Sequence, residues 1–149
     1  MKIQIQVHIN KPSEQIFSYI SNFSNHREMF SANLDSKQTS EGSVGVGTTM
    51  RNIAKFMGMK MEERFVVTGY ELNKFIEKRS APGSTFVTSD KMSLEKVNGG
   101  TLFTLYCDAD FTGIMKLLDG FMEKQVGKIL SKDMNLLKEK IESGNIKLS

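Results

Sequence analysis

The sequence predicts an α+β fold in which a curved antiparallel sheet of about seven strands wraps around a long C-terminal helix, with two short helices after the first strand. Residues 1–10 alternate between apolar and polar side chains, as a half-buried strand does. Residues 34–111 continue in strand-like segments separated by glycines and polar residues, and residues 114–142 form one amphipathic helix. Because a helix with so broad an apolar stripe needs an apolar partner, we expect the sheet to cover it.

Composition and charge place the chain among ordinary globular proteins. Its 149 residues suffice for one domain, expected to cover 1–149, and 39% of them are hydrophobic and 25% charged. No segment stays apolar over the roughly 20 residues that a membrane-spanning helix needs. The net charge is only +3, and the basic residues are scattered. The sequence therefore predicts neither integral membrane association nor a nucleic-acid partner.

Cysteine usage and the N-terminal pattern predict a compartment. Cys107 is the only cysteine, so no disulfide can form within the chain, which suits a reducing cytosol. Residues 1–10 alternate and lack the continuous apolar core of a signal peptide. We therefore expect a cytoplasmic protein.

The segment after the first strand carries the signals of two short helices. Pro12 suits the first turn of a helix, and apolar residues follow at helical spacing from Ile16. Polar residues at 22–25 interrupt this pattern before a second helical turn over 26–30. The chain then returns to strands.

Six further strands are expected between glycine-rich or polar breaks. They cover 34–40, 48–56, 59–68, 72–80, 85–95 and 101–111. Short connections between consecutive strands are typical of hairpins, so the sheet should be antiparallel.

Alternation within these strands predicts which side chains face the helix. In the last strand they are Phe103, Leu105, Cys107, Ala109 and Phe111. The same parity assigns to the inner face Met50, Asn52, Ala54 and Phe56; Met59, Met61, Glu63, Phe65 and Val67; and Phe86, Thr88, Asp90, Met92 and Leu94. Polar side chains thus join an otherwise apolar surface.

The segment 72–80 mixes charged and apolar residues on both faces. We expect Phe75 to point inward, which would bring Arg79 within reach of Glu63 or Asp90. Such a pairing would be needed, because a buried charge is tolerated only with a partner. A single β-bulge would reverse this assignment downstream of it.

The C-terminal helix is expected to begin after Thr112 as N-cap, with Gly113 at the turn. Gly120 and Gly127 lie on its polar face, where the pattern gives no reason for them. Its apolar stripe consists of Ile114, Leu117, Leu118, Phe121, Met122, Val126, Ile129, Leu130, Leu136, Leu137 and Ile141.

Two local motifs accompany this order of elements: the Pro-x-Glu-x-Ile-Phe segment at 12–17 and the turn Gly45-Val-Gly47-Thr48 leading into a strand. Together they resemble, over essentially the whole chain, the polyketide cyclase/dehydrase and lipid-transport family. This family belongs to the START-like (SRPBCC), helix-grip superfamily, which also contains the birch-pollen allergen proteins. The chain departs from the pattern where such families often have aspartate and then tryptophan, since it has Asn22 and then Met29-Phe30. The resemblance implies a cavity between sheet and helix for a hydrophobic small molecule, with many members binding or carrying ligands and some catalysing reactions.

Signals for other kinds of site are weak. The glycine-rich segment 41–48 lacks the Gly-Lys-Ser/Thr ending of a phosphate-binding loop and precedes a strand, so it reads as a hairpin. His8 and His26 form no cluster with metal-ligand spacing, and Cys107 has no predicted histidine neighbour to activate it. No metal and no cofactor are therefore expected.

The leading hypothesis is a binding or transport module for a lipid or a polycyclic, polyketide-like compound, held between sheet and helix. Glu63, Asp90 and Arg79 would either orient the ligand or form an internal ion pair. The two alternatives are a cyclase or aromatase-type enzyme with an acid or base in the same cavity, and a protein-interaction module with a filled core. The pattern favours binding over catalysis and leaves the oligomeric state open. The predicted ligand-binding residues are Met50, Asn52, Met61, Glu63, Phe65, Phe75, Arg79, Phe86, Thr88, Asp90, Phe103, Leu118, Phe121, Met122 and Gln125.

Overall fold

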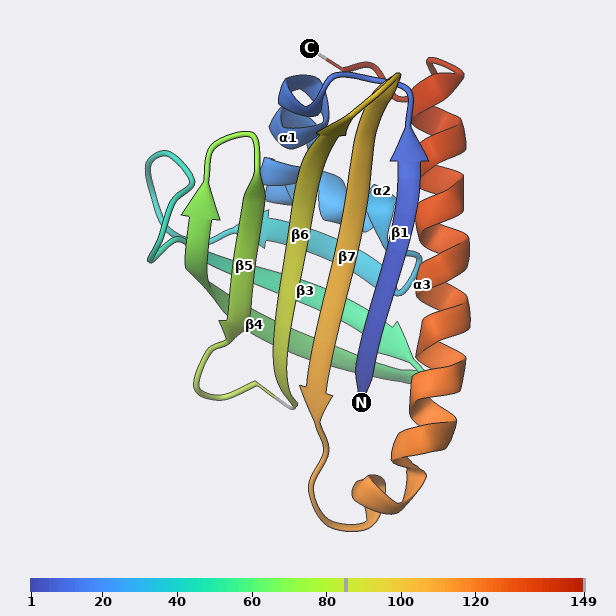
Figure 1. The fold of residues 1–149 in the computed structure, drawn as a ribbon. Coiled ribbons are helices and arrows are strands. Elements are labelled where there is room, and N and C mark those ends of the chain that lie inside the picture. The colour runs from blue at the N-terminus through green and yellow to red at the C-terminus, as the bar shows by residue number, and fades with distance from the viewer. Residues whose placement is uncertain (85, 149) are drawn as a thin grey trace.

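A computed structural model describes residues 1–84 and 86–148 (Figure 1). Seven strands form one antiparallel sheet in the order β1-β7-β6-β5-β4-β3-β2, which confirms the predicted architecture. The strands are β1 (Lys2–Ile9), β2 (Asn33–Gln38), β3 (Thr49–Phe56), β4 (Met59–Glu71), β5 (Phe75–Ser80), β6 (Val87–Val97) and β7 (Gly100–Asp110). Thr85, at the predicted start of the sixth strand, lies outside the described residues.

The helices complete the predicted arrangement. After β1 come α1 (Ser13–Ser21), the short 3-10 helix η1 (Phe23–Asn25) and α2 (His26–Met29), which carry the chain to the opposite edge of the sheet. After β7 come a second 3-10 helix, η2 (Gly113–Leu118), and α3 (Asp119–Glu142). In Figure 1, α3 runs the length of the molecule beside β1, and β3 and β4 cross behind β6 and β7. The sheet is therefore strongly curved, with α3 against its concave side.

The C-terminal helix begins after Thr112 as expected, but its first six residues, Gly113–Leu118, form a 3-10 helix and not an α-helix. Gly113 adopts a positive φ of 64°, and Thr112 makes no side-chain capping hydrogen bond. The η2 segment extends past the end of the sheet (Figure 1), so nothing covers Ile114 and Leu117, which are 80% and 85% exposed. The apolar stripe that the helix buries is therefore narrower than predicted. Four more of its predicted members are exposed: Leu118, Phe121, Ile129 and Leu136.

A β-bulge in β4 reverses the faces of the residues that follow it. The register with β5 shifts between Val67 and Gly69, so Val67 is buried and Tyr70, three positions later, also points inward. The Tyr70 ring packs edge-on against Phe17, with 5.6 Å between ring centroids.

This bulge overturns the predicted orientation of β5. Ile76 lies opposite Tyr70 and Lys78 opposite Val67, and both side chains are buried. Phe75 and Arg79 therefore lie on the outer face, where the Lys91 ammonium sits 4.4 Å from the centroid of the Phe75 ring. The inward position that we assigned to Phe75, and the proximity of Arg79 to Glu63 or Asp90, were wrong.

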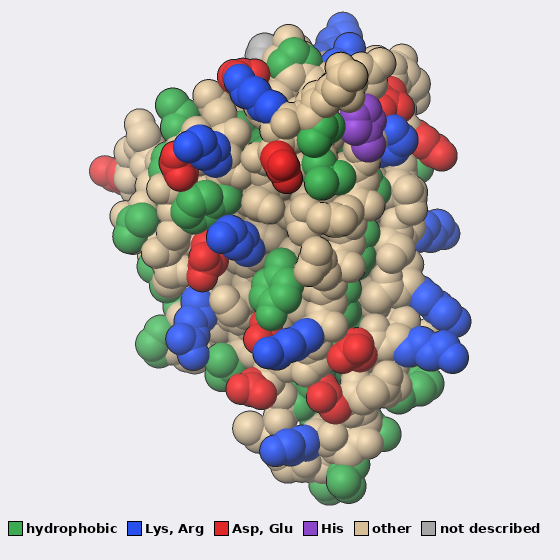
Figure 2. Space-filling view, viewed as in Figure 1, with side chains coloured by type: hydrophobic (Ala, Val, Ile, Leu, Met, Phe, Trp, Pro, Cys, Tyr) green, Lys and Arg blue, Asp and Glu red, His purple; other side chains and the backbone are tan. Residues whose placement is uncertain are grey.

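The packed core lies toward one end of the molecule. There α1 and the second half of α3 bury large side chains against the sheet, among them Ile16, Phe17, Met134, Leu137 and Ile141. On the face of β6, β7 and β1, acidic and basic side chains are interspersed (Figure 2). Among the described residues, no helix combines the length and apolar character needed to span a membrane.

Candidate functional site

A cavity of about 190 Å³ lies between the concave face of the sheet and the first half of α3. Met122, Val126 and Leu130 of α3 form one wall, and Phe30 and Ala32 of the segment after α2 lie at one side. The apolar lining from the sheet and its flanks is Ala54, Phe56, Met61, Phe65, Phe86, Met92, Leu105, Ala109 and Phe111. The polar lining is Asn33, Asn52, Glu63, Lys78, Thr88, Asp90 and Cys107. Met1 also lines the cavity, and its N-terminal ammonium is paired with Asp119 at 2.9 Å.

Strand alternation places most of these side chains. Where the register runs without interruption, as between β3 and β4, between β6 and β7 and between β7 and β1, every second residue of β3, β6 and β7 points into the cavity or the core. The predicted site residues that line the cavity are Asn52, Met61, Glu63, Phe65, Phe86, Thr88, Asp90 and Met122.

The other predicted site residues lie elsewhere. Met50 and Phe103 are buried in the packed core, and Phe75 and Arg79 lie on the outer face of β5. Leu118 is in η2 and is exposed. Phe121 and Gln125 of α3 line a separate groove.

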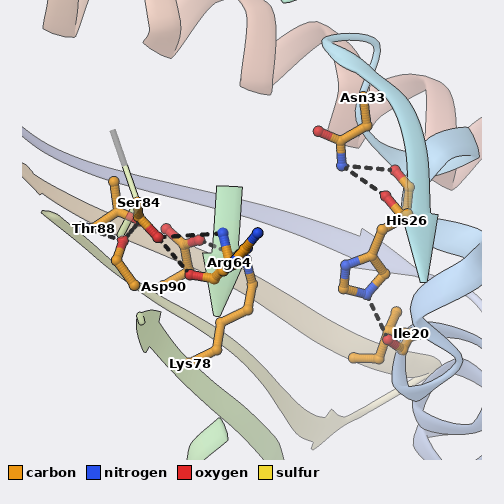
Figure 3. A network of polar contacts seen from close by, with 10 residues as sticks. Ile20, His26, Asn33, Arg64, Lys78, Ser84, Thr88 and Asp90 are labelled. Atoms are coloured by element: carbon orange, nitrogen blue, oxygen red, sulfur yellow. Dashed lines mark hydrogen bonds and ion pairs between the residues drawn. The ribbon is translucent and has the colours of Figure 1, made fainter. Parts of the chain in front are cut away.

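Lys78 supplies a cation to this cavity that the sequence pattern assigned to the opposite face. Its ammonium lies 2.8 Å from Asp90 Oδ2, and the two residues are directly paired across β5 and β6 (Figure 3). The same ammonium sits 3.6 Å from the centroid of the Phe65 ring. The pairing satisfies a charge that burial would otherwise make costly. The only sequence signal for it is the inward Asp90, which needs a cationic neighbour.

Glu63 and Asn52 form a second polar pair. They are opposite one another in the register of β3 and β4, a position that brings the Cβ atoms of two residues to about 5 Å. Burial raises the pKa of the Glu63 carboxyl above its ordinary value, while the Lys78 charge opposes this shift. The amide of Asn52 is buried, and its Oδ1 atom has no hydrogen-bond partner among the described residues.

Cys107 lies opposite Asp90 in the register of β6 and β7 and lines the cavity. Burial, followed by the nearby Asp90 carboxylate, raises the pKa of this thiol far above its ordinary range. A thiol held in its neutral form is a poor nucleophile. Among residues 1–84 and 86–148, no group of three or more His, Cys, Asp or Glu side chains is placed to hold a metal ion.

His26 is a structural residue behind the cavity wall. It is fully buried, its Nε2 donates to the carbonyl oxygen of Ile20 at 2.8 Å (Figure 3), and its ring packs edge-on against Phe30. Burial, and then the positive charge of Lys78, lower the pKa of His26 to about 4. The imidazole is therefore neutral at neutral pH.

A groove of about 480 Å³ adjoins the cavity on the outside. It runs between Phe121, Gln125 and Ile129 of α3 and the segments around Ser31 and Met57. Ala32 and Phe56 line both spaces, so they form the boundary between cavity and groove.

The family follows from a match along the chain. A model described as "Polyketide cyclase / dehydrase and lipid transport" matches residues 1–142. The chain belongs to this family. No curated protein matches the sequence.

Solved structures share the fold of this family member at low sequence identity. A protein from Thermus thermophilus is 15% identical with a TM-score of 0.81, and the match covers 98% of this chain and 100% of that one. A START superfamily protein from Mycobacterium smegmatis is 17% identical with a TM-score of 0.68, covering 91% and 98%. The ZhuI aromatase/cyclase from Streptomyces sp. R1128 is 10% identical with a TM-score of 0.67, covering 97% and 92%. These similarities establish the helix-grip fold.

Proposed function

We propose that this protein binds an apolar small molecule in the cavity between its sheet and α3. The observation that carries the proposal is a lining dominated by Met, Phe, Leu, Val and Ala with a small convergent set of polar groups. Such a lining is typical of small-molecule sites, in which apolar burial supplies affinity and a few polar atoms fix orientation. Family membership supports the same role.

The size of the cavity limits what fits inside it. An apolar cavity of about 150 Å³ already admits benzene, so about 190 Å³ accepts a small ring system. Drug-sized ligands occupy about 300–1,000 Å³, so a larger ligand must extend past Phe56 into the adjoining groove. The exposed Phe121 and Ile129 would then cover the extended part of the ligand.

A second candidate function is proton transfer on a bound substrate, as in an aromatase or cyclase. It is favoured by Glu63 and Asp90, two carboxylates that line an apolar cavity, and by the raised pKa of Glu63. The fold similarity to an aromatase/cyclase is consistent with it. In that case Glu63→Gln would abolish turnover while leaving binding intact.

Thermal-shift screening of a panel of sterols, fatty acids, flavonoids, polycyclic phenols and polyketides tests the binding proposal. A ligand that binds only the folded state raises the unfolding temperature, and at about 100 times its Kd it contributes about 2.7 kcal/mol. We expect stabilisation by at least one class. Absence of stabilisation across the panel would contradict the proposal.

Filling the cavity provides the matched control. Ala54→Leu and Ala109→Leu would place new side chains in the cavity, whereas Ala81→Leu would not. Ligand stabilisation should be lost in the first two variants and kept in the third. The filled variants should remain folded, because the added methylene groups enter empty space.

A further inference from the structure

The polar wall of the cavity contains an unsatisfied hydrogen-bond acceptor. Asn52 is 4% exposed and lines the cavity, and its Oδ1 has no partner among the described residues. Thr88, another polar residue of the cavity, already has a partner, because its hydroxyl shares a hydrogen bond of 3.0 Å with Ser80. A buried polar atom without a partner is costly, so a ligand that donates a hydrogen bond there gains affinity.

The charges around this acceptor disfavour an anion. Two cations belong to described residues that line the cavity, and both have partners. Lys78 is bound to Asp90 and stacked on Phe65. The N-terminal ammonium of Met1 is paired with Asp119 at 2.9 Å and donates to the carbonyl oxygen of Ala109. Glu63 stands directly across from Asn52, and Asp90 also lines the cavity. A ligand carboxylate would therefore have to displace an ion pair or lie beside like charges.

A cationic ligand head is disfavoured for the complementary reason. The Lys78 ammonium is buried in the same small cavity, so a second ammonium would be repelled by it and would have to compete with it for Asp90. Glu63, the carboxylate opposite Asn52, is a weakened partner for a cation, because burial raises its pKa and so favours its neutral form. An uncharged donor meets neither penalty, because it only needs to reach an acceptor.

We propose that the polar end of the ligand is an uncharged hydroxyl group, from an alcohol or a phenol, that donates to Asn52 Oδ1 beside Glu63. This inference rests on the proposed binding function and adds the chemical class of the ligand head. The apolar body of the ligand would lie against Met61, Met92 and Met122.

Probes of one skeleton with different heads test the inference. Dissociation constants for 2-naphthol, 2-methoxynaphthalene, 2-naphthoate and 2-(aminomethyl)naphthalene can be measured by isothermal titration calorimetry at pH 7. We expect 2-naphthol to bind about tenfold more tightly than each of the others, as the gain of one hydrogen bond predicts. Equal or tighter binding of the methoxy compound, the carboxylate or the amine would overturn the inference.

Variants connect the preference to the proposed atom. Asn52→Leu should bring the affinity for 2-naphthol down to that for 2-methoxynaphthalene while leaving the latter unchanged. Thr88→Val, at another polar position of the cavity, should keep the preference. An undiminished preference in Asn52→Leu, in a protein whose thermal unfolding shows it to be folded, would overturn the assignment.

The two proposals fail in different ways. Binding of the methoxy compound or the carboxylate in preference to 2-naphthol would leave the cavity function standing and remove the hydroxyl inference. Absence of binding by every probe, together with absence of stabilisation across the broader ligand panel, would remove both.

Discussion

Lys78 and Asp90 form an ion pair of 2.8 Å inside a mostly apolar cavity, with side chains that are only 7% and 17% exposed. The pair depends on the β4 bulge, because without the shift between Val67 and Gly69 the side chain of Lys78 would point to solvent. The bulge in β4 thus places the Lys78 cation inside the cavity.

Replacing one partner of this ion pair should destabilise the protein more than replacing both partners. Lys78→Met leaves the Asp90 carboxylate unpaired and should lower the free energy of unfolding by roughly 3–5 kcal/mol, whereas Lys78→Met combined with Asp90→Leu should recover most of the loss. Urea unfolding of the wild type, both single variants and the double variant gives the coupling energy directly. A double variant as unstable as the sum of the single changes would contradict this account of the pair.

Replacing Glu63 should stabilise the protein at neutral pH. Its pKa is raised above the ordinary 4.5 in the folded state, so the folded protein holds this proton more tightly than the unfolded chain does. Between the ordinary and the raised pKa, stability therefore falls as pH rises. Glu63→Gln removes this loss, so it should raise the unfolding temperature at pH 8 more than at pH 4. The exposed Glu95→Gln is the control and should show no such difference.

His26 should make the fold sensitive to acid. Its pKa falls from 6.5 to about 4 on folding, so between these values the unfolded chain takes up a proton that the folded protein does not. The free energy of unfolding should thus decrease by roughly 3 kcal/mol as pH falls from 7 to 4. The difference between urea unfolding of Glu63→Gln and of Glu63→Gln combined with His26→Phe, followed against pH, isolates this effect, because Glu14 and Glu142, whose pKa values are lowered by hydrogen bonds, are present in both. The slope of the free energy of unfolding against pH should become flatter in His26→Phe and stay the same in His8→Gln. An unchanged slope in His26→Phe would contradict the role assigned to His26.

Two glycines should respond to alanine in opposite directions. At Gly100, with φ of 147°, a Cβ atom would lie 2.3 Å from the Ile9 carbonyl oxygen, so Gly100→Ala should be strongly destabilising. At Gly127 in α3, a Cβ atom would meet nothing within 4 Å, so Gly127→Ala should stabilise by up to about 1 kcal/mol through helix propensity. Thermal unfolding measures both. Destabilisation by Gly127→Ala would indicate a close packing partner for that face of α3.

Sequence patterns located the fold and the part of the site that lies on regular strands. Strand alternation placed Asn52, Thr88 and Asp90 on the inner face, because β3 and β6 run through these positions without a register shift. Lys78 was missed for the reason that also misplaced Arg79: a bulge adds one residue and exchanges the two faces downstream.

The 3-10 geometry and the exposure of the first helical turns could not be predicted from periodicity alone. Ile114 and Leu117 continue the helical spacing, yet they lie in η2, beyond the surface that α3 buries. Whether an apolar residue is covered depends on where the sheet ends in space, which local sequence does not encode. The same limit applies to Phe121 and Gln125, which face the groove instead of the cavity.

Methyl resonances of the methionines offer the most direct measurement of the central claim, that an apolar molecule enters the cavity. Met1, Met61, Met92 and Met122 line it, whereas Met50 and Met134 are buried outside it and Met57 is exposed on the surface. When 2-naphthol is titrated into protein carrying ¹³C-methyl methionine, we expect shifts and intermolecular NOEs at the four lining methionines. Changes confined to Met57, or an absence of change at all seven, would contradict the claim.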